Sequence, residues 1–304
     1  MTARPGTVGE VLAEAAARLA AAGDETARLD AEVLLAHVLG GTRSTLIVRR
    51  DVALEADEAA RFAELVARRA AGQPVAYLTG EREFHSLALA VDPRVLIPRP
   101  ETETVVETAL SALRALAAEG FGRRLRVVDV GTGSGAIAVA LAHELAREGA
   151  GARVSLAALD RSLACLAVAR VNAERHAPGA VSLVCGDLTA AFRDASLDLV
   201  VSNPPYLSQD ELERVSPEVR AEPVAALLGG DMDGAGTLRA LLADAARVLR
   251  PGGFLVSEIG FMQGESVAAL ARDLGFGHVE IRRDLAGRDR VVSARWRPAA
   301  GAER

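Results

Sequence analysis

A four-residue run, Asn203-Pro204-Pro205-Tyr206, follows an apolar stretch at 197–202. The two prolines remove two backbone donors, and each pushes the residue before it out of the helical region. The Asn203 side-chain oxygen and the Pro204 carbonyl can each accept one N–H of a planar NH₂ group, and Tyr206 can lie flat against that group. A turn that only closes a strand is the alternative. The run therefore predicts a catalytic site that selects an sp² amino or amide nitrogen and turns it toward an electrophile.

A glycine-rich run, Gly131-Thr132-Gly133-Ser134-Gly135, follows a second apolar stretch at 125–130. Glycines let a chain turn tightly and bring its amides close to a ligand at the N-terminus of the next helix. With Ala136 the run also satisfies the G-x-G-x-x-A pattern of dinucleotide-binding proteins. We therefore expect a cofactor site here, with a tight turn that binds nothing as the alternative. The candidate contacts are Gly131, Thr132, Gly133, Ser134 and Gly135.

Two aspartates end the next apolar stretches along the chain. Asp160 stands where a carboxylate can accept both ribose hydroxyls of an adenosine, although it could instead cap the following helix. Asp187 follows Cys185-Gly186 and can accept from an adenine amino group, or serve as an ordinary turn residue. Both carboxylates are candidate cofactor-binding residues.

The elements that must position these residues alternate between strands and helices. Strands are expected at 125–130, 154–159, 181–185, 197–202, 253–259, 278–283 and 290–296. Helices are expected at 100–120, 134–147, 162–175, 237–249 and 264–274. Continuous apolar strands in this alternation predict an α/β fold with a mostly parallel seven-stranded sheet covered on both faces. Ligands of such sheets lie beyond the carboxyl ends of the strands, where the strand order reverses.

The N-terminal part follows a different pattern. Helices are expected near 7–23, 26–39 and 57–71, the first opened by a Thr7/Glu10 capping box. A β-hairpin with a turn at Asp92-Pro93 is expected after them. The predicted division is a helical domain at 1–82, a hairpin linker at 83–97, the α/β domain at 98–298 and a flexible tail at 299–304.

Composition and net charge argue against several classes of function. The 304 residues suggest roughly two domains, and the net charge of −6 argues against binding nucleic acid by bulk electrostatics. The sequence has no lysine, which excludes a lysine base or Schiff base. Two cysteines and five scattered histidines lack metal-ligand spacing, so no metal site is expected. Neither a signal-peptide pattern nor a long apolar run is present, which predicts a cytoplasmic protein with no membrane partner.

Taken together and in this order, the glycine-rich run, Asp160, Asp187 and Asn203–Tyr206 resemble the class I S-adenosylmethionine-dependent methyltransferases that modify planar amino nitrogens. More narrowly, the chain is similar to the HemK (PrmC) family, which methylates N5 of the glutamine in the Gly-Gly-Gln motif of class-1 peptide chain release factors. Three further stretches carry the narrower match: Gly72–Gly80 with Arg82-Glu83-Phe84, Leu96–Glu103, and Glu222-Pro223 with Ala226-Leu227.

The resemblance implies a Rossmann-like class I methyltransferase sheet, S-adenosyl-L-methionine as cofactor, and release factors as protein substrates held by the N-terminal domain. It implies a catalytic role for Asn203, Pro204, Pro205 and Tyr206, with Asn203 also near the cofactor. Family members often have a tryptophan after the aspartate that ends strand three, whereas this chain has Leu188, which we expect to cover the adenine. Arg99 and Glu101 would either line the methionine end of the cofactor or cap the helix at Pro100.

Three other functions compete with this one. N6-adenine and N2-guanine methyltransferases of nucleic acid share the Asn-Pro-Pro-Tyr run, but the N-terminal region is acidic, with ten arginines against thirteen acidic residues over 1–85. NAD-dependent oxidoreduction explains the glycines but not the run at 203–206. A non-catalytic cofactor-binding or ribosome-associated module would leave that run unexplained. We therefore expect a protein substrate and no direct nucleic-acid partner.

Overall fold

The computed structural model describes residues 6–120 and 122–297. The chain forms two compact units. The smaller consists of Met1–Glu81 with Val215–Ala221, and the larger of Arg82–Arg214 with Glu222–Arg304. The sequence-based division has no such return of the chain to the smaller unit, and its tail at 299–304 lies outside the described residues.

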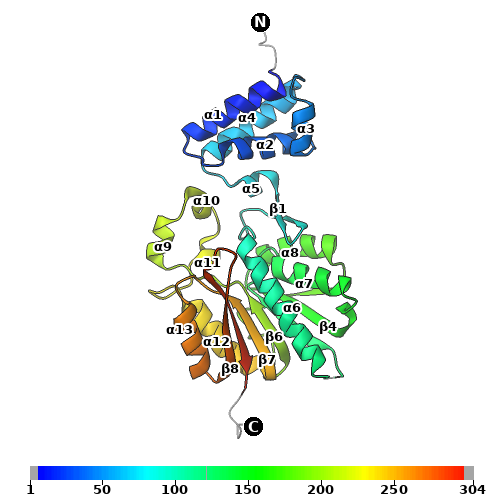
Figure 1. Cartoon of the computed structure of the whole chain (residues 1–304), viewed down its shortest axis with the longest axis vertical. Coiled ribbons are helices and arrows are strands. Elements are labelled where there is room, and N and C mark those ends of the chain that lie inside the picture. Colours follow the sequence, from blue (N-terminus) through cyan, green and yellow to red (C-terminus); the bar gives the residue numbers. More distant parts are fainter. Residues whose placement is uncertain (1–5, 121, 298–304) are drawn as a thin grey trace. The chain divides into compact units, whose positions relative to one another are not determined.

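The larger unit is built on a seven-stranded sheet with the order β5-β4-β3-β6-β7-β9-β8. Figure 1 labels β4, β6, β7 and β8 of this sheet, with helices beside them. The strands are β3 (Leu125–Val130), β4 (Val154–Asp160), β5 (Val181–Cys185), β6 (Leu197–Ser202), β7 (Leu249–Glu258), β8 (Phe276–Arg283) and β9 (Asp289–Trp296). The first five run parallel, and β9 and β8 complete one edge antiparallel. This confirms the predicted mostly parallel α/β sheet.

Helices cover both faces of this sheet because alternate side chains of each strand point to opposite sides. Val127 and Leu199 pack in one apolar cluster with α6 (Glu103–Ala118) and α7 (Ala136–Arg147). Val128 and Val200 pack in a second cluster with α12 (Gly236–Val248) and α13 (Gly264–Asp273). The remaining helical segments of this unit are η1 (Pro100–Thr102), η2 (Gly151–Arg153), α8 (Leu163–His176), α9 (Gln209–Arg214) and α11 (Val224–Leu227).

Over residues 6–120 and 122–297, no helix has the length and apolar character needed to cross a membrane.

The strand order reverses at β3. The chain moves outward from β3 through β4 to β5 and then returns to the other side of β3 with β6. In register, Val130 pairs with Leu159 on one side and with Ser202 on the other. The residues that follow these three strands therefore meet at one edge of the sheet, where α/β proteins bind their ligands.

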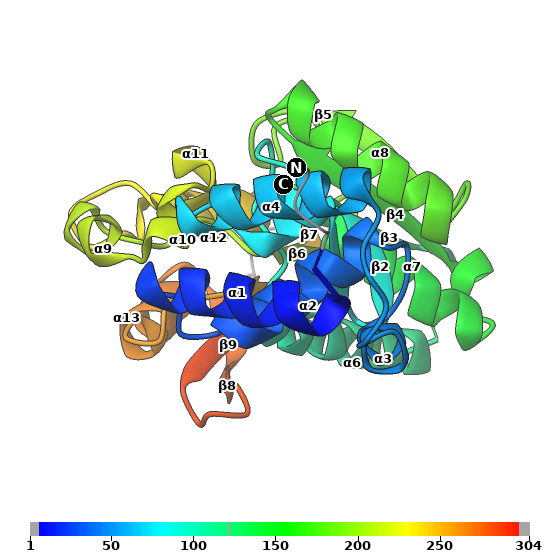
Figure 2. The same cartoon turned by 90° about the horizontal axis from the view of Figure 1, so that it is seen from above.

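The smaller unit is a helical bundle, as predicted, and Figure 2 shows three of its long helices, α1, α2 and α4. Its helices are α1 (Val8–Ala21), α2 (Ala27–Val38), α3 (Arg43–Val48), α4 (Ala56–Ala70), α5 (Val75–Thr79) and α10 (Pro217–Arg220). The Thr7/Glu10 capping box is present, with the Thr7 amide 2.8 Å from the Glu10 carboxylate. The sequence prediction missed α3 and α5, because six and five residues are too few to show a helical period.

A buried arginine ties the segment at 215–221 to this bundle. Arg69 of α4 is 5% exposed, donates from Nε to Asp30 Oδ2 at 2.6 Å, and also forms ion pairs with Asp24 and Glu218. Glu218 belongs to α10 and follows Tyr206, the last residue of the predicted catalytic run, by twelve positions. The charge pairing explains why a segment so distant in sequence from α4 belongs to the smaller unit.

The hairpin turns at a different place from the one predicted. Its strands are β1 (Glu81–Phe84) and β2 (Leu87–Ala90), so the turn is His85-Ser86 and not Asp92-Pro93. Both turn residues have positive φ, 52° and 62°, as a two-residue hairpin turn of the right twist requires. Asp92 instead forms a separate turn, in which its carbonyl accepts from the Val95 amide at 3.1 Å. The prediction favoured the proline as turn former and overlooked a pair that lacks glycine.

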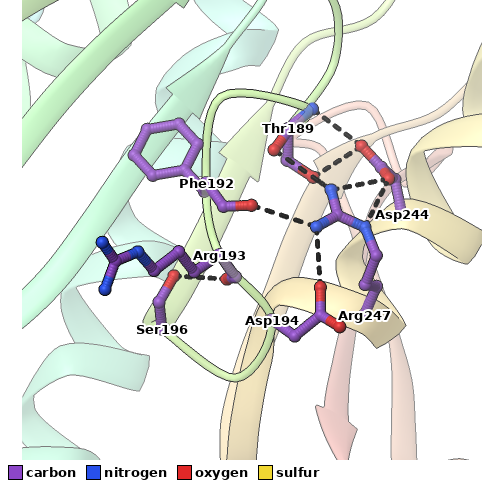
Figure 3. A network of polar contacts seen from close by, with 7 residues as sticks. All are labelled: Thr189, Phe192, Arg193, Asp194, Ser196, Asp244 and Arg247. Atoms are coloured by element: carbon purple, nitrogen blue, oxygen red, sulfur yellow. Dashed lines mark hydrogen bonds and ion pairs between the residues drawn. The ribbon is translucent and has the colours of Figure 1, made fainter.

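The connection from β5 to β6 is held by a network centred on Arg247 of α12 (Figure 3). Its guanidinium donates to the carbonyls of Phe192 and Thr189 at 3.0 and 3.1 Å, and it pairs with Asp194. Asp244 accepts the Thr189 amide at 2.8 Å. Thr189 comes two residues after Asp187, so the network fixes the start of the loop that carries Asp187 and Leu188.

Candidate active site

A cavity of about 510 Å³ opens at the edge of the sheet where the strand order reverses. Its walls include the loops after β3, β4, β5 and β6, residues 94–96, Pro98 and Thr102, and residues from the segment 223–241. The volume is in the range of sites that enclose a small organic ligand. Of the predicted site residues, it is lined by Gly131, Thr132, Gly133, Ser134, Asp160, Asp187, Leu188, Asn203, Pro204 and Pro205.

The glycine-rich loop needs its glycines for conformation. Gly131 and Gly133 have φ of +70° and +55°, a region that L side chains rarely adopt. Gly135, at +82°, does not line the cavity. A Cβ there would lie 3.2 Å from the Cβ of Ala169 in α8, so Gly135 serves the close packing of α7 on α8.

A buried carboxylate that the prediction did not assign to the site supports this loop. Asp129 is 1% exposed, and its Oδ2 accepts from the Thr132 hydroxyl at 2.6 Å and from the Ala138 amide at 3.2 Å. Burial raises the pKa of Asp129 to about 7, and the nearby Asp160 charge adds to the rise. Asp129 thereby connects the loop to the first turn of α7. Its place directly before the glycines was the available sequence signal.

Asp160 is buried and does not cap α8. Ser162 is the N-cap, with its hydroxyl accepting from the Cys165 amide at 3.3 Å, so the capping alternative for Asp160 is wrong. One Asp160 oxygen accepts from the Gly133 amide at 3.0 Å and the other from the Ser162 amide at 2.9 Å. The carboxylate thus joins the loops after β3 and β4, and each oxygen keeps further acceptor capacity at the cavity wall.

The end of β5 contributes two neighbouring residues to the cavity. Asp187 and Leu188 both line it, and Leu188 also packs against the apolar cluster beneath the sheet. Leu188 has a φ of +44°, which is uncommon for a residue other than glycine, asparagine or aspartate. The Thr189 contacts to α12 hold the chain in this conformation, and as a result an apolar side chain faces the ligand space.

The segment Asn203–Tyr206 follows β6, and we call it the corner. Side chains of elements that are distant in the sequence hold it in place. Asn203 Nδ2 donates to the Thr102 hydroxyl at 3.1 Å, and Thr102 Oγ1 lies 2.6 Å from Glu258 Oε2. Tyr206 does not line the cavity; its hydroxyl donates to Glu258 Oε1 at 3.1 Å. Burial and the Glu258 charge raise the pKa of Tyr206, so it stays a protonated phenol. The Nδ2–Thr102 contact leaves over the oxygen of the amide, and Asn203 is among the residues that line the cavity.

Two glycines let a neighbouring loop approach this corner more closely than any side chain would allow. A Cβ on Gly229 would lie 2.7 Å from the Pro205 carbonyl oxygen, and a Cβ on Gly234 would lie 2.4 Å from that of Tyr206. The Leu207 amide donates to Leu227 O at 2.9 Å. The sequence prediction missed these residues, although the Gly229-Gly230 pair was a visible signal.

Arg99 acts as a structural link in this structure. It forms an ion pair with Glu222, a buried carboxylate that also accepts from the Ile97 amide at 2.9 Å. Glu101 is exposed in the first turn of η1. Neither Arg99 nor Glu101 lines the cavity, so contacts from them to the methionine end of a cofactor stay a prediction.

Comparison with known proteins agrees with this geometry. The family model for the PrmC N-terminal domain matches residues 10–80, and the model for the methyltransferase small domain matches 108–222. A release factor glutamine methyltransferase of Nitratidesulfovibrio vulgaris is 45% identical over 294 residues, 95% of each chain. One of Moorella thermoacetica is 46% identical over 290 residues, 95% of this chain and 98% of the relative.

A solved structure shows the likeness of the fold. The catalytic domain of hMettl16, in complex with MAT2A 3′UTR hairpin 6, has a TM-score of 0.54 at 15% identity, covering 80% of this chain and 82% of the other. The sheet, the cavity at its reversal point and the methyltransferase model define a class I methyltransferase. Within that class, the chain belongs to the release factor glutamine methyltransferase family.

Proposed function

We propose that this protein transfers a methyl group from S-adenosyl-L-methionine to the side-chain amide nitrogen of the glutamine in the Gly-Gly-Gln motif of class-1 release factors. The names of relatives similar over nearly the whole chain support the substrate. The observation that carries the chemistry is that Asn203 lines the cavity while its Nδ2 donates to Thr102, so that its oxygen is the part of the amide not used in this contact. An acceptor at that place suits an NH₂ group.

The residues of the cavity fit S-adenosyl-L-methionine. Asp160 has spare acceptor capacity for ribose hydroxyls, and Asp187 and Leu188 offer a carboxylate and an apolar side chain for an adenine. The backbone of Gly131–Ser134 lines the same cavity, whereas Gly135 does not line it and packs against Ala169. When bound, the cofactor would supply a methyl group activated by its attachment to a sulfonium.

The residues of the corner act by positioning and hydrogen bonding. An amide nitrogen is a weak nucleophile, since its lone pair is delocalised into the carbonyl. Asn203 and Pro204 would accept its two N–H groups and stabilise the positive charge that develops there. Among the described residues that line the cavity the titratable groups are Arg94, Asp160, Arg161, Cys165 and Asp187, so no histidine base is present. Alignment of the nitrogen, which can contribute up to about 7–11 kcal/mol in well-oriented systems, would be the main catalytic factor.

The smaller unit is our candidate for binding the release factor. The PrmC N-terminal domain model matches it over 10–80, and its acidic composition suits a protein partner better than a nucleic acid. Because release factors work on the ribosome, the reaction would take place in the cytoplasm.

Labelled S-adenosyl-L-methionine tests the proposal when incubated with the protein and, in parallel, a class-1 release factor, its Gly-Gly-Ala variant, DNA and ribosomal RNA. We expect label on the release factor alone, located at the glutamine by peptide mass spectrometry. Label on the Gly-Gly-Ala variant would refute the proposed atom. Label confined to nucleic acid would instead show a base methyltransferase.

A further inference from the structure

A buried carboxylate outside the cavity lies behind both ends of the Asn203–Tyr206 corner. Glu258, the last residue of β7, is 1% exposed and does not line the cavity. Its Oε2 lies 2.6 Å from the hydroxyl of Thr102, which is 3% exposed, and its Oε1 lies 3.1 Å from the Tyr206 hydroxyl. Thr102 in turn lies 3.1 Å from Asn203 Nδ2. One carboxylate thus connects to both polar side chains of the corner.

When Glu258 is ionised, the chemistry of these groups fixes the direction of each of these hydrogen bonds. An ionised carboxylate only accepts, so the Thr102 and Tyr206 hydroxyls must both give their single proton to Glu258. Having donated its proton, Thr102 can only accept from Asn203. The atom of Asn203 that faces Thr102 must then be the NH₂ nitrogen, since its carbonyl oxygen in that place would meet another acceptor. The amide orientation is therefore determined by a charge two hydrogen bonds away.

We propose that Glu258 and Thr102 are positioning residues that hold the Asn203 carbonyl oxygen toward the cavity as the acceptor for the substrate NH₂ group. The inference rests on the proposed function and names residues that serve the same site. Glu258 does not line the cavity, and it reaches the corner through its hydrogen bonds with Thr102 and Tyr206. Its role is to set which atom of Asn203 the substrate meets.

Protonation of Glu258 would remove this control. A protonated carboxyl can donate, so the Thr102 hydroxyl would be free to donate to Asn203 and the amide could turn over. Charged or titratable groups face Glu258 from three elements: Arg290 of β9, Glu101 of η1 and Tyr206 after β6. Burial raises the pKa of Glu258, while the Thr102 hydrogen bond and the Arg290 charge oppose the rise. Activity that depends on the ionised form is lost as the pH falls through this raised pKa.

Threonine variants test the chain of hydrogen bonds that runs from Glu258 through Thr102 to Asn203. They are assayed in the full-length protein with release factor and S-adenosyl-L-methionine. T102V keeps the shape but removes the hydroxyl, and we expect kcat to fall by about 10–100-fold with the cofactor Kd within about threefold. T102S restores the hydroxyl and should recover most of the loss. T108V is the matched control, because Thr108 is an equally buried threonine whose hydroxyl contacts Thr104 O and Arg282 and not the corner. Its kcat should equal that of the wild type.

E258Q supplies a readout that folding defects do not imitate. A glutamine amide replaces one of the two carboxylate oxygens by an NH₂ group, so one of the Thr102 and Tyr206 hydroxyls would face a donor and could no longer donate at that place. We expect a lower kcat in E258Q that no longer falls toward acid pH, in contrast to the wild type, when both are measured at saturating substrates. The inference would be overturned if the kcat of E258Q still fell toward acid pH as that of the wild type does, or if T102V had the wild-type kcat. Either result would leave the proposed function intact. A wild-type protein that never modifies the release factor would overturn both.

Discussion

The two sides of the cavity are supported in different ways. One side, which we call the cofactor side, consists of the glycine-rich loop and Asp160. There Asp129 forms a hydrogen bond with Thr132, three positions away in the sequence, and Asp160 forms one with Gly133, 27 positions away. On the acceptor side, Asn203 is held by Thr102 at a separation of 101 positions, and Tyr206 by Glu258 at 52. One wall is thus encoded mostly by neighbours in sequence and the other by residues brought together only by the fold.

The difference has a physical origin in the two loops. The glycine-rich loop has amides of its own, and these donate to neighbouring groups: Thr132 to Leu159 O at 2.9 Å and Gly135 to Thr132 O at 2.8 Å. Pro204 and Pro205 have no N–H to donate. The corner they form is therefore held by the side chains of Thr102, Glu258 and Gln263, the last donating to Tyr206 O at 3.3 Å. A corner that lacks two backbone donors is rigid locally but depends on distant partners for its placement.

The largest effect is expected on the acceptor side, from N203A. Loss of a preorganised hydrogen-bonding group at a site of developing charge typically lowers kcat by about 10²–10³-fold. The cofactor Kd should change by less than about threefold, because Asp160 and the glycine-rich loop are untouched. Steady-state kinetics and calorimetric titration check the two values. Wild-type turnover in N203A would refute the role assigned to this residue.

D160A should show the opposite profile. Hydrogen bonds to a charged group contribute about 1.5–3 kcal/mol, so we expect cofactor affinity to fall by roughly 10–100-fold. At saturating cofactor, kcat should stay close to that of the wild type. D273A, which removes an exposed carboxylate of α13 in the larger unit, is the control for a general effect of charge. If D160A lowered kcat as strongly as N203A does, the assignment of Asp160 to cofactor binding and of Asn203 to catalysis would be wrong.

Y206F is expected to have a smaller effect on the acceptor side. It removes one hydrogen bond to Glu258 and leaves the ring, which corresponds to a loss of about 0.5–1.5 kcal/mol and a fall in kcat of about 2–10-fold. The cofactor Kd should not change. A defect as deep as that of N203A would mean that the Tyr206 hydroxyl contacts the substrate directly.

The smallest effect on turnover is expected from D129N, which instead changes how stability depends on pH. The folded-state pKa of about 7 lies above the unfolded value of about 3.9. Between these values the folded protein keeps a proton that the unfolded chain has lost, so stability from this group falls as the pH rises toward 7. An asparagine does not titrate. The Tm of D129N relative to the wild type should therefore increase by a few degrees between about pH 5 and pH 8.

That dependence can be followed by thermal melts of both proteins across the pH range. A Tm difference that stays constant with pH would show that Asp129 keeps an ordinary pKa in the fold. In that case the loop on the cofactor side would be braced by a charged group, and the two walls would be more alike than the structure indicates.

The same contrast shows what the sequence can and cannot predict. The strand period, the glycines and Asp160 are local patterns, and they led to the sheet and to residues that line the cavity. The support of the acceptor corner was not visible, because nothing near Asn203 in sequence points to Thr102 or Glu258. The return of 215–221 to the smaller unit was missed for the same reason, since it depends on the pairing of Arg69 with Glu218.

The most direct test of the account is a crystal structure of the protein with S-adenosylhomocysteine and the Gly-Gly-Gln region of a release factor. We predict the glutamine side-chain nitrogen within about 3 Å of both Asn203 Oδ1 and Pro204 O, with Asn203 Nδ2 still on Thr102. A glutamine amide bound elsewhere, or an Asn203 whose nitrogen faces the substrate, would contradict the account.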